Sequence, residues 1–117
     1  IARVLETEKK VAKVFYPGLK THALHSIAKR QMPGGFGGML SFEVKGSPDK
    51  FMKKLKYIKR AVSLGGVEST INSPMKTSHS KLTAEERKAV GISDNLVRLS
   101  VGIEDPTDLI NDIKQAL

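Results

Sequence analysis

The fold is decided by the stretch Leu96-Val-Arg-Leu-Ser-Val-Gly-Ile-Glu104. Because side chains alternate along a β-strand, one face of this stretch takes the apolar side chains of Val97, Leu99 and Val101. Arg98 falls on the opposite face and, where helices cover the apolar face, it points away from them. Its planar, permanently charged guanidinium then suits bidentate binding of a carboxylate or phosphate. A surface or interface ion pair of Arg98 is the competing interpretation.

A second stretch, Ala61-Val-Ser-Leu-Gly-Gly-Val-Glu-Ser69, is predicted as a short β-type run that breaks at a Gly-Gly turn. Ser63 offers a hydroxyl group just before this turn, where backbone groups lie open to a ligand. From the residues alone, the two stretches indicate a two-layer domain with a possible anion site.

The remaining segments alternate between strand and helix patterns. We expect strands at 11–16, 39–45 and 68–72, and helices at 1–10, 21–30, 50–60, 83–90 and 105–117. The first helix is expected to be exposed, and Thr21 is expected to cap the second one. The buried side of that second helix is predicted to take Leu24, Ile27 and Ala28. Together these elements predict an α+β (α/β two-layer) fold, with a mostly antiparallel or mixed sheet and helices on one face.

The net charge is +8 and the pI is near 9.8, which is the main argument for a nucleic-acid partner. Most of the basic residues between Lys50 and Arg60, however, fall on one side of a predicted amphipathic helix. Their simplest role is therefore to solvate that helix. Two tyrosines and four phenylalanines form no recognisable stacking platform. A stand-alone basic nucleic-acid-binding module is kept as the alternative from another class of function.

The chain has no cysteine, no apolar run long enough for a membrane span and no signal-peptide pattern. We therefore expect a cytoplasmic protein with no membrane partner. His22 and His25 are three residues apart on a predicted helix, but no third ligand completes a zinc site, so we expect no metal centre. Ile1 lies inside a helical pattern with no capping residue before it, which suggests that the chain begins part-way through a helix of a longer protein.

Several motifs occur in the same order as in a known family. They are Val14-Phe-Tyr-Pro-Gly-Leu19, Ala28-Lys-Arg-Gln-Met32, Gly35-Phe-Gly-Gly-Met39, Ser63-Leu-Gly-Gly-Val-Glu-Ser69 and Leu96-Val-Arg-Leu-Ser-Val-Gly-Ile-Glu-Asp105. Together they closely resemble the C-terminal part of the Cys/Met metabolism PLP-dependent enzymes. This family contains the cystathionine lyases, cystathionine γ-synthase, methionine γ-lyase and the homoserine-ester sulfhydrylases. The resemblance covers essentially the full length of the chain.

The resemblance implies the small C-terminal domain of a fold-type I PLP enzyme, which packs on a large PLP-binding domain. In such enzymes the arginine of the L-V-R-L-S motif binds the α-carboxylate of the amino-acid substrate, a role that carries over to Arg98. The serine of the S-L-G segment borders the same pocket, which carries over to Ser63 and its neighbour Leu64. On this basis residues 1–10 are expected to end an inter-domain helix, and residues 11–117 to form the substrate-side domain.

The large domain and its cofactor lysine, in a motif like T-K-Y-x-x-G-H-S-D, are absent from this sequence. The resemblance therefore implies pyridoxal 5'-phosphate (PLP) in the full-length enzyme, whereas this chain holds no catalytic or cofactor-binding residue and is expected to be inactive alone. The full-length protein is expected to be a homotetramer. The isolated chain is expected to self-associate through the sheet face that carries Arg98 and through parts of residues 1–10.

The residue before Ser63 helps to distinguish the reactions within the family. Several γ-synthases and γ-lyases look to have Glu there, whereas Val62 is similar to the residue in many bacterial β-lyases and in methionine γ-lyase. The resemblance thus favours a carbon-sulfur lyase of sulfur amino-acid metabolism that acts on cystathionine or a related thioether amino acid. It leaves β- or γ-cleavage open. A cystathionine γ-synthase or homoserine-ester sulfhydrylase domain is the alternative within the family.

Overall fold

A five-stranded sheet with the order β1-β2-β5-β4-β3 forms the centre of the structure, a computed structural model that describes residues 1–117. Its strands are β1 (Val11–Phe15), β2 (Met39–Val44), β3 (Lys59–Arg60), β4 (Thr70–Asn72) and β5 (Leu96–Ser100). The pairs β1–β2, β2–β5 and β4–β5 are antiparallel, and only the short β3 pairs in parallel, with β4. The predicted mixed sheet is therefore confirmed, with the arginine-bearing strand at its centre.

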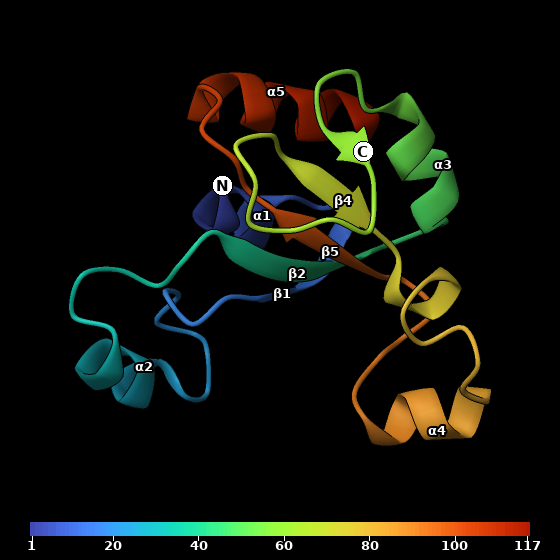
Figure 1. Ribbon diagram of the computed structural model, residues 1–117, viewed down its shortest axis with the longest axis horizontal. Helices are drawn as coiled ribbons and strands as arrows, with labels where there is room; N and C mark the ends of the chain where they lie inside the picture. The colour runs from blue at the N-terminus through green and yellow to red at the C-terminus, as the bar shows by residue number, and fades with distance from the viewer.

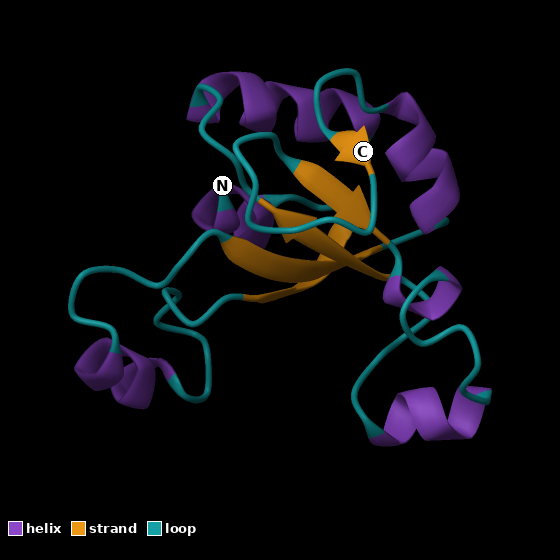
Figure 2. Ribbon diagram, viewed as in Figure 1, coloured by secondary structure: helices purple, strands orange, loops and turns teal.

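Helices of two kinds surround the sheet. They are α1 (Ala2–Thr7), α2 (His25–Gln31), α3 (Pro48–Lys54), the 3₁₀ helix η1 (Pro74–Lys76), α4 (Ala84–Ala89) and α5 (Pro106–Ala116). Figure 1 shows α3 and α5 next to each other on one side of the sheet, while α2 and α4 project away at the opposite side. The strands and the long loops that carry these two outer helices are distinguished in Figure 2. None of the helices is both long enough and apolar enough to cross a membrane.

The core lies between the sheet and the inner helices. Val97 and Leu99 of β5 are completely buried and share one cluster with Leu109 and Ile113 of α5. This face of β5 is the one that its alternating pattern predicts. The start of α5 follows from the sequence too, because the side chain of Asp105 accepts a hydrogen bond from the amide of Thr107 and Pro106 fits the first helical turn.

Asp112 of α5 is buried and holds a turn that is distant in the sequence. Its Oδ1 accepts a hydrogen bond from the amide of Lys56 at 2.8 Å, and its Oδ2 accepts the amides of Tyr57 and Ile58 at 2.9 and 3.0 Å. Burial opposes ionisation of this carboxyl, but the amide hydrogen bonds outweigh it and hold its pKa below the ordinary value of 3.8. These hydrogen bonds give partners to three consecutive backbone amides in the turn that follows the end of α3 at Lys54.

The predicted helix at 50–60 is therefore wrong in its second half. The chain turns after Lys54, and Lys59 and Arg60 lie in β3 instead of on a helix. Ile58 is buried, and a turn instead of a helix places it in the core. Helical periodicity did not reveal this turn because the carboxylate that stabilises it lies more than 50 residues further along the chain.

The boundaries of the second helix also differ from the prediction. Thr21 does not cap it, because its hydroxyl donates to the carboxylate of Glu6, and α2 begins at His25. Leu24 and Ile27 are exposed, so of the predicted buried side only Ala28 is buried.

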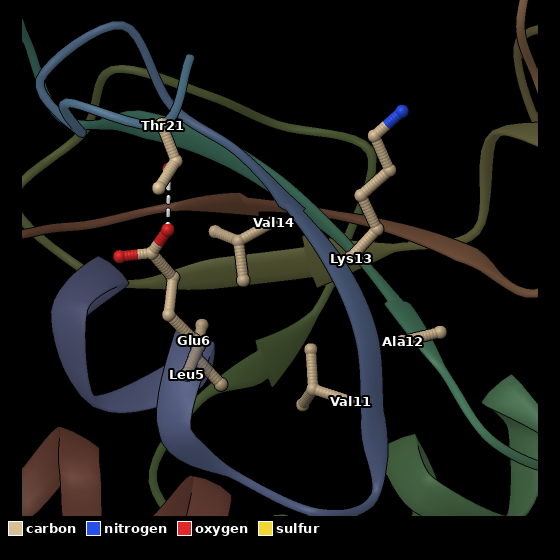
Figure 3. A pocket seen from close by; sticks show the side chains of 7 residues that line it. All are labelled: Leu5, Glu6, Val11, Ala12, Lys13, Val14 and Thr21. Atoms are coloured by element: carbon tan, nitrogen blue, oxygen red, sulfur yellow. Dashed lines mark hydrogen bonds between the residues drawn. The ribbon is translucent and has the colours of Figure 1, made fainter.

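The exposure predicted for residues 1–10 is wrong for α1. Leu5 is almost completely buried and Ala2 is buried, because α1 packs against β1. Beside this contact lies a pocket of about 290 Å³ between α1, β1 and the chain around Thr21. In Figure 3 the carboxylate of Glu6 points toward the hydroxyl of Thr21, while Lys13 extends away from the pocket.

Candidate functional site

Arg98 lies on the face of β5 opposite the helices, as the alternation predicts. Its neighbours in the strand, Val97 and Leu99, are fully buried in the core, whereas the Arg98 side chain is only partly buried. Its Nη2 donates to the carbonyl oxygen of Val62 at 2.8 Å and approaches that of Ser63 at 3.4 Å. The buried Nε has no hydrogen-bond partner, and no acidic side chain forms an ion pair with Arg98. Arg98 therefore forms no surface ion pair within this chain, and the competing interpretation is left with an ion pair across an interface.

The segment 61–69 is a loop and not the predicted β-type run. Residues of β4 and β5 hold this loop through two hydrogen bonds. The amide of Gly65 donates to Ser100 Oγ at 2.9 Å, and Thr70 Oγ1 donates to the carbonyl oxygen of Ser63 at 2.7 Å. Gly65 has a φ of +72°, a conformation that favours glycine, so the predicted glycine turn is confirmed at this residue.

This loop covers part of the sheet face that was expected to be open. Leu96 and Ser100, which share that face with Arg98, are buried with 7% and 2% of their surface exposed. The expectation of an uncovered face is therefore wrong at these two positions. Arg98 alone among the three remains partly exposed.

The end of the loop is held by Glu104. Glu104 Oε1 accepts a hydrogen bond from the amide of Ser69 at 2.6 Å, and Oε2 accepts one from the Ser69 hydroxyl at 2.8 Å. Ser69 Oγ in turn accepts the amide of Gly102 at 2.9 Å. Burial opposes ionisation of Glu104, but the hydrogen bonds from Ser69 outweigh it and lower the pKa of the carboxyl.

The upper surface of the loop is open to solvent. Val62 and Leu64 each expose 57% of their surface, and Ser63 between them is exposed as well. A hollow of about 170 Å³ lies beside Val62 and is also lined by Asn72, the residue that pairs with Arg98 across β4 and β5. The hollow is not lined by Arg98, Ser63 or Leu64, but these three residues predicted for the site lie on one surface region beside it. The carbonyl oxygen of Ser63 lies within 3.4 Å of the Arg98 guanidinium.

The structure adds residues that the sequence reasoning did not assign to the site. Ser100 is buried and Glu104 is half-buried, and their hydrogen bonds determine where the loop lies. Both belong to the same short motif as Arg98, and Ser100 falls on the same face by alternation. That alternation was the available signal for Ser100, whereas the partner of Glu104 lies 35 residues away and no local pattern indicates it.

Each lysine of this chain is exposed, and the hydrogen bonds and ion pairs of the lysines run to acidic side chains or to the carbonyl oxygen of Leu117, none of them to the loop 62–66. The arrangement around Arg98 offers instead a guanidinium with free donors, next to an open, largely apolar loop. Such a surface suits recognition of a carboxylate on an otherwise small or apolar molecule.

Residues 1–117 match the family model described as Cys/Met metabolism PLP-dependent enzyme. The chain belongs to this family. Among its relatives are a cystathionine gamma-lyase of Dictyostelium discoideum, 53% identical over 120 residues, and a cystathionine beta-lyase of Lactococcus lactis, 50% identical over 119 residues. Each alignment covers 100% of this chain and 31% of the relative. The chain thus spans about a third of the length of these relatives.

Solved structures of Cys/Met metabolism PLP-dependent enzymes have the same fold. A cystathionine gamma-lyase from Micromonospora echinospora superposes with a TM-score of 0.94 at 39% identity, covering 99% of this chain and 31% of that one. A cystathionine gamma-synthase from Xanthomonas oryzae, in complex with aminoacrylate and cysteine, gives a TM-score of 0.91 at 46% identity and covers 98% and 30% of the two chains. The resemblance found in the sequence, and the small α+β domain that it implied, are confirmed.

Proposed function

We propose that this chain is the substrate-side, C-terminal domain of a PLP-dependent carbon-sulfur lyase that acts on cystathionine or a related thioether amino acid. In this proposal Arg98 binds the α-carboxylate of the substrate, and Ser63 and Leu64 border the same pocket. Residues 1–10 end an inter-domain helix, and residues 11–117 form the domain itself. The large domain supplies PLP and the cofactor lysine, and the full-length enzyme is a homotetramer.

The observation that carries the proposal is the state of the Arg98 guanidinium. It is oriented by the carbonyl oxygen of Val62, it has no acidic partner, and its Nη1 donates to no group of this chain. An arginine that is held but not neutralised is prepared to receive an anionic ligand from outside the chain. Because guanidinium and carboxylate match in a planar, two-point contact, Arg98 would fix the orientation of the amino acid as well as its affinity.

The names of the relatives support the substrate class but not the direction of the reaction. Cystathionine lyases of both the beta and the gamma kind are about equally similar to this chain. A cystathionine gamma-synthase shares its fold at 46% identity, so a synthase remains the second candidate. Val62, where several γ-synthases and γ-lyases have Glu, favours a lyase. Incubation of the full-length enzyme with cystathionine, followed by separate measurement of pyruvate and 2-oxobutyrate, distinguishes β- from γ-cleavage.

The test of the carboxylate role is Arg98→Ala in the full-length enzyme. Hydrogen bonds to charged groups contribute about 1.5–3 kcal/mol, so we expect kcat/KM for the amino acid to fall by roughly 10- to 150-fold or more, mainly through KM. Bound PLP, followed by its absorbance, is expected to remain. Arg30→Ala on the exposed face of α2 is the matched control and should leave KM unchanged. An unchanged KM in Arg98→Ala would remove Arg98 from this role.

Four measurements on the 117-residue chain test the rest of the proposal. We expect no turnover of cystathionine and no imine absorbance on addition of PLP, because the cofactor lysine is supplied by the large domain. Titration with DNA at moderate salt should show no tight binding. Tight binding with a steep salt dependence would favour a basic nucleic-acid-binding module instead. Sedimentation of the same sample measures the self-association expected of the isolated chain.

A further inference from the structure

Glu104 makes a set of contacts that neither core packing nor ion pairing explains. It forms no ion pair, and both of its carboxylate oxygens are used by Ser69, a residue that is completely buried. It lies four residues after the end of the central strand β5 and six residues after Arg98 in the sequence. Its partner ends the loop whose first residues contact Arg98. Glu104 is therefore linked to Arg98 in two ways, along the chain and through the loop.

The contact between the two segments is tight over several residues. The amide of Ile103 donates to the carbonyl oxygen of Val67 at 2.9 Å, next to the bonds made by Ser69. A Cβ atom placed on Gly102 would lie 2.2 Å from that same carbonyl oxygen and 2.5 Å from Glu104 Oε2. Only glycine at position 102 lets the backbones approach this closely. The end of the loop therefore has one position relative to β5.

The beginning of the loop is held through its backbone by β4 and β5. Thr70 Oγ1 donates to the carbonyl oxygen of Ser63 at 2.7 Å, and the amide of Gly65 donates to Ser100 Oγ at 2.9 Å, while the side chains of Val62, Ser63 and Leu64 are exposed. Gly65 and Gly66, which follow them, have more backbone freedom than any other residue type. The position of the Val62 carbonyl oxygen, and with it the orientation of Arg98, therefore depends on the hydrogen bonds at both ends of the loop, those near Ser63 and those that Glu104 makes with Ser69.

We propose that Glu104 is a positioning residue for the substrate carboxylate: by holding Ser69 it fixes the loop 62–69, whose carbonyl groups orient the guanidinium of Arg98. This inference rests on the proposed function of Arg98. A loop released at Ser69 lets the guanidinium adopt several orientations, of which only a fraction binds the carboxylate. The apparent affinity for substrate falls by that fraction, whereas the reaction of bound substrate changes little.

The experiment compares four variants of the full-length enzyme: Glu104→Gln, Arg98→Ala, the double variant and Glu68→Gln. Glutamine keeps the size of Glu104 but leaves one oxygen for two donors. We expect KM for the amino acid to rise by about 3- to 30-fold in Glu104→Gln, with kcat changed by less than about threefold. Glu68→Gln makes the same chemical change one residue before Ser69, in an exposed pair with Lys59, and should change neither constant.

The double variant separates positioning from general stability. Once Arg98 is absent, its orientation no longer matters, so Glu104→Gln should change kcat/KM of Arg98→Ala by less than about twofold. Additive effects of the two changes, or an unchanged KM in Glu104→Gln alone, would overturn the proposal. If Glu104→Gln does not fold, Ser69→Ala replaces it, and we expect the same rise in KM. This change removes the hydroxyl that donates to Glu104 and accepts the amide of Gly102. An Arg98→Ala variant with unaltered KM would overturn the proposed function itself.

Discussion

Replacement of Asp112 by Asn tests the main long-range polar contact of the fold. The carboxylate accepts three backbone amides and also a hydrogen bond from Gln115 Nε2 at 3.0 Å. Asparagine has the same shape but only one acceptor oxygen, so its amino group must face a buried backbone amide. Lost charged hydrogen bonds and an unpaired buried donor each cost about 1–3 kcal/mol, and we expect a net loss of about 2–4 kcal/mol in the free energy of unfolding.

The assay is urea and thermal unfolding of the 117-residue chain, followed by circular dichroism. With an unfolding entropy of about 0.25 kcal/mol/K for a chain of this length, the expected loss corresponds to a fall in Tm of roughly 8–16 °C. Asp108→Asn is the matched control, because Asp108 lies exposed in the first turn of the same helix. Its interaction with the helix dipole is worth less than about 1 kcal/mol.

The same variant makes a prediction about pH. The pKa of Asp112 is lower in the folded chain than its ordinary value of 3.8, so its stabilising contribution is complete above that value and is lost as pH falls through the lower, folded pKa. The difference in stability between wild type and Asp112→Asn should therefore be constant near neutral pH and should shrink in acid. A difference below about 0.5 kcal/mol at pH 7, or one that grows as pH falls, would refute the reasoning.

Further predictions concern backbone approach and helix capping. Gly102→Ala should destabilise the chain by about 1–3 kcal/mol, because its Cβ would overlap the carbonyl oxygen of Val67, whereas Gly34→Ala, with open space around it, should be neutral in the same urea titration. Thr83→Ala should cost about 1 kcal/mol locally, since it removes the capping box of α4, and hydrogen exchange of the Glu86 amide should speed up by roughly five- to tenfold. Equal exchange rates in the two proteins would contradict the capping argument.

The elements that were predicted well have their signals within a few residues. The alternation in β5 revealed its buried face, and the helix expected at 83–90 is found as α4, because strand faces and short capped helices depend on neighbouring side chains. Arg98 could be placed on the outer face by the same argument. Its role in binding a carboxylate remains a prediction.

The errors occur where a distant residue competes with a local signal. Thr21 has the chemistry of a helix cap, but Glu6 takes its hydroxyl, and the helix starts four residues later. In the same way Asp112 stabilises a turn inside a segment whose periodicity is helical. Glu6 and Asp112 cannot be identified as these partners from a single sequence, because a contact between distant segments produces no regular residue spacing.

The outer edge of the sheet at β3 bears on how copies of this chain meet. This edge consists of only Lys59 and Arg60, both exposed, whereas a longer apolar edge would offer its free backbone groups to a strand from another molecule. A second copy arriving at β3 would bring its own Arg60 toward the unpaired charge of Arg60, since Lys59 is paired with Glu68, and would find too few residues for a stable ladder. Aggregation by strand addition is thereby opposed at this edge, by both like-charge repulsion and shortness.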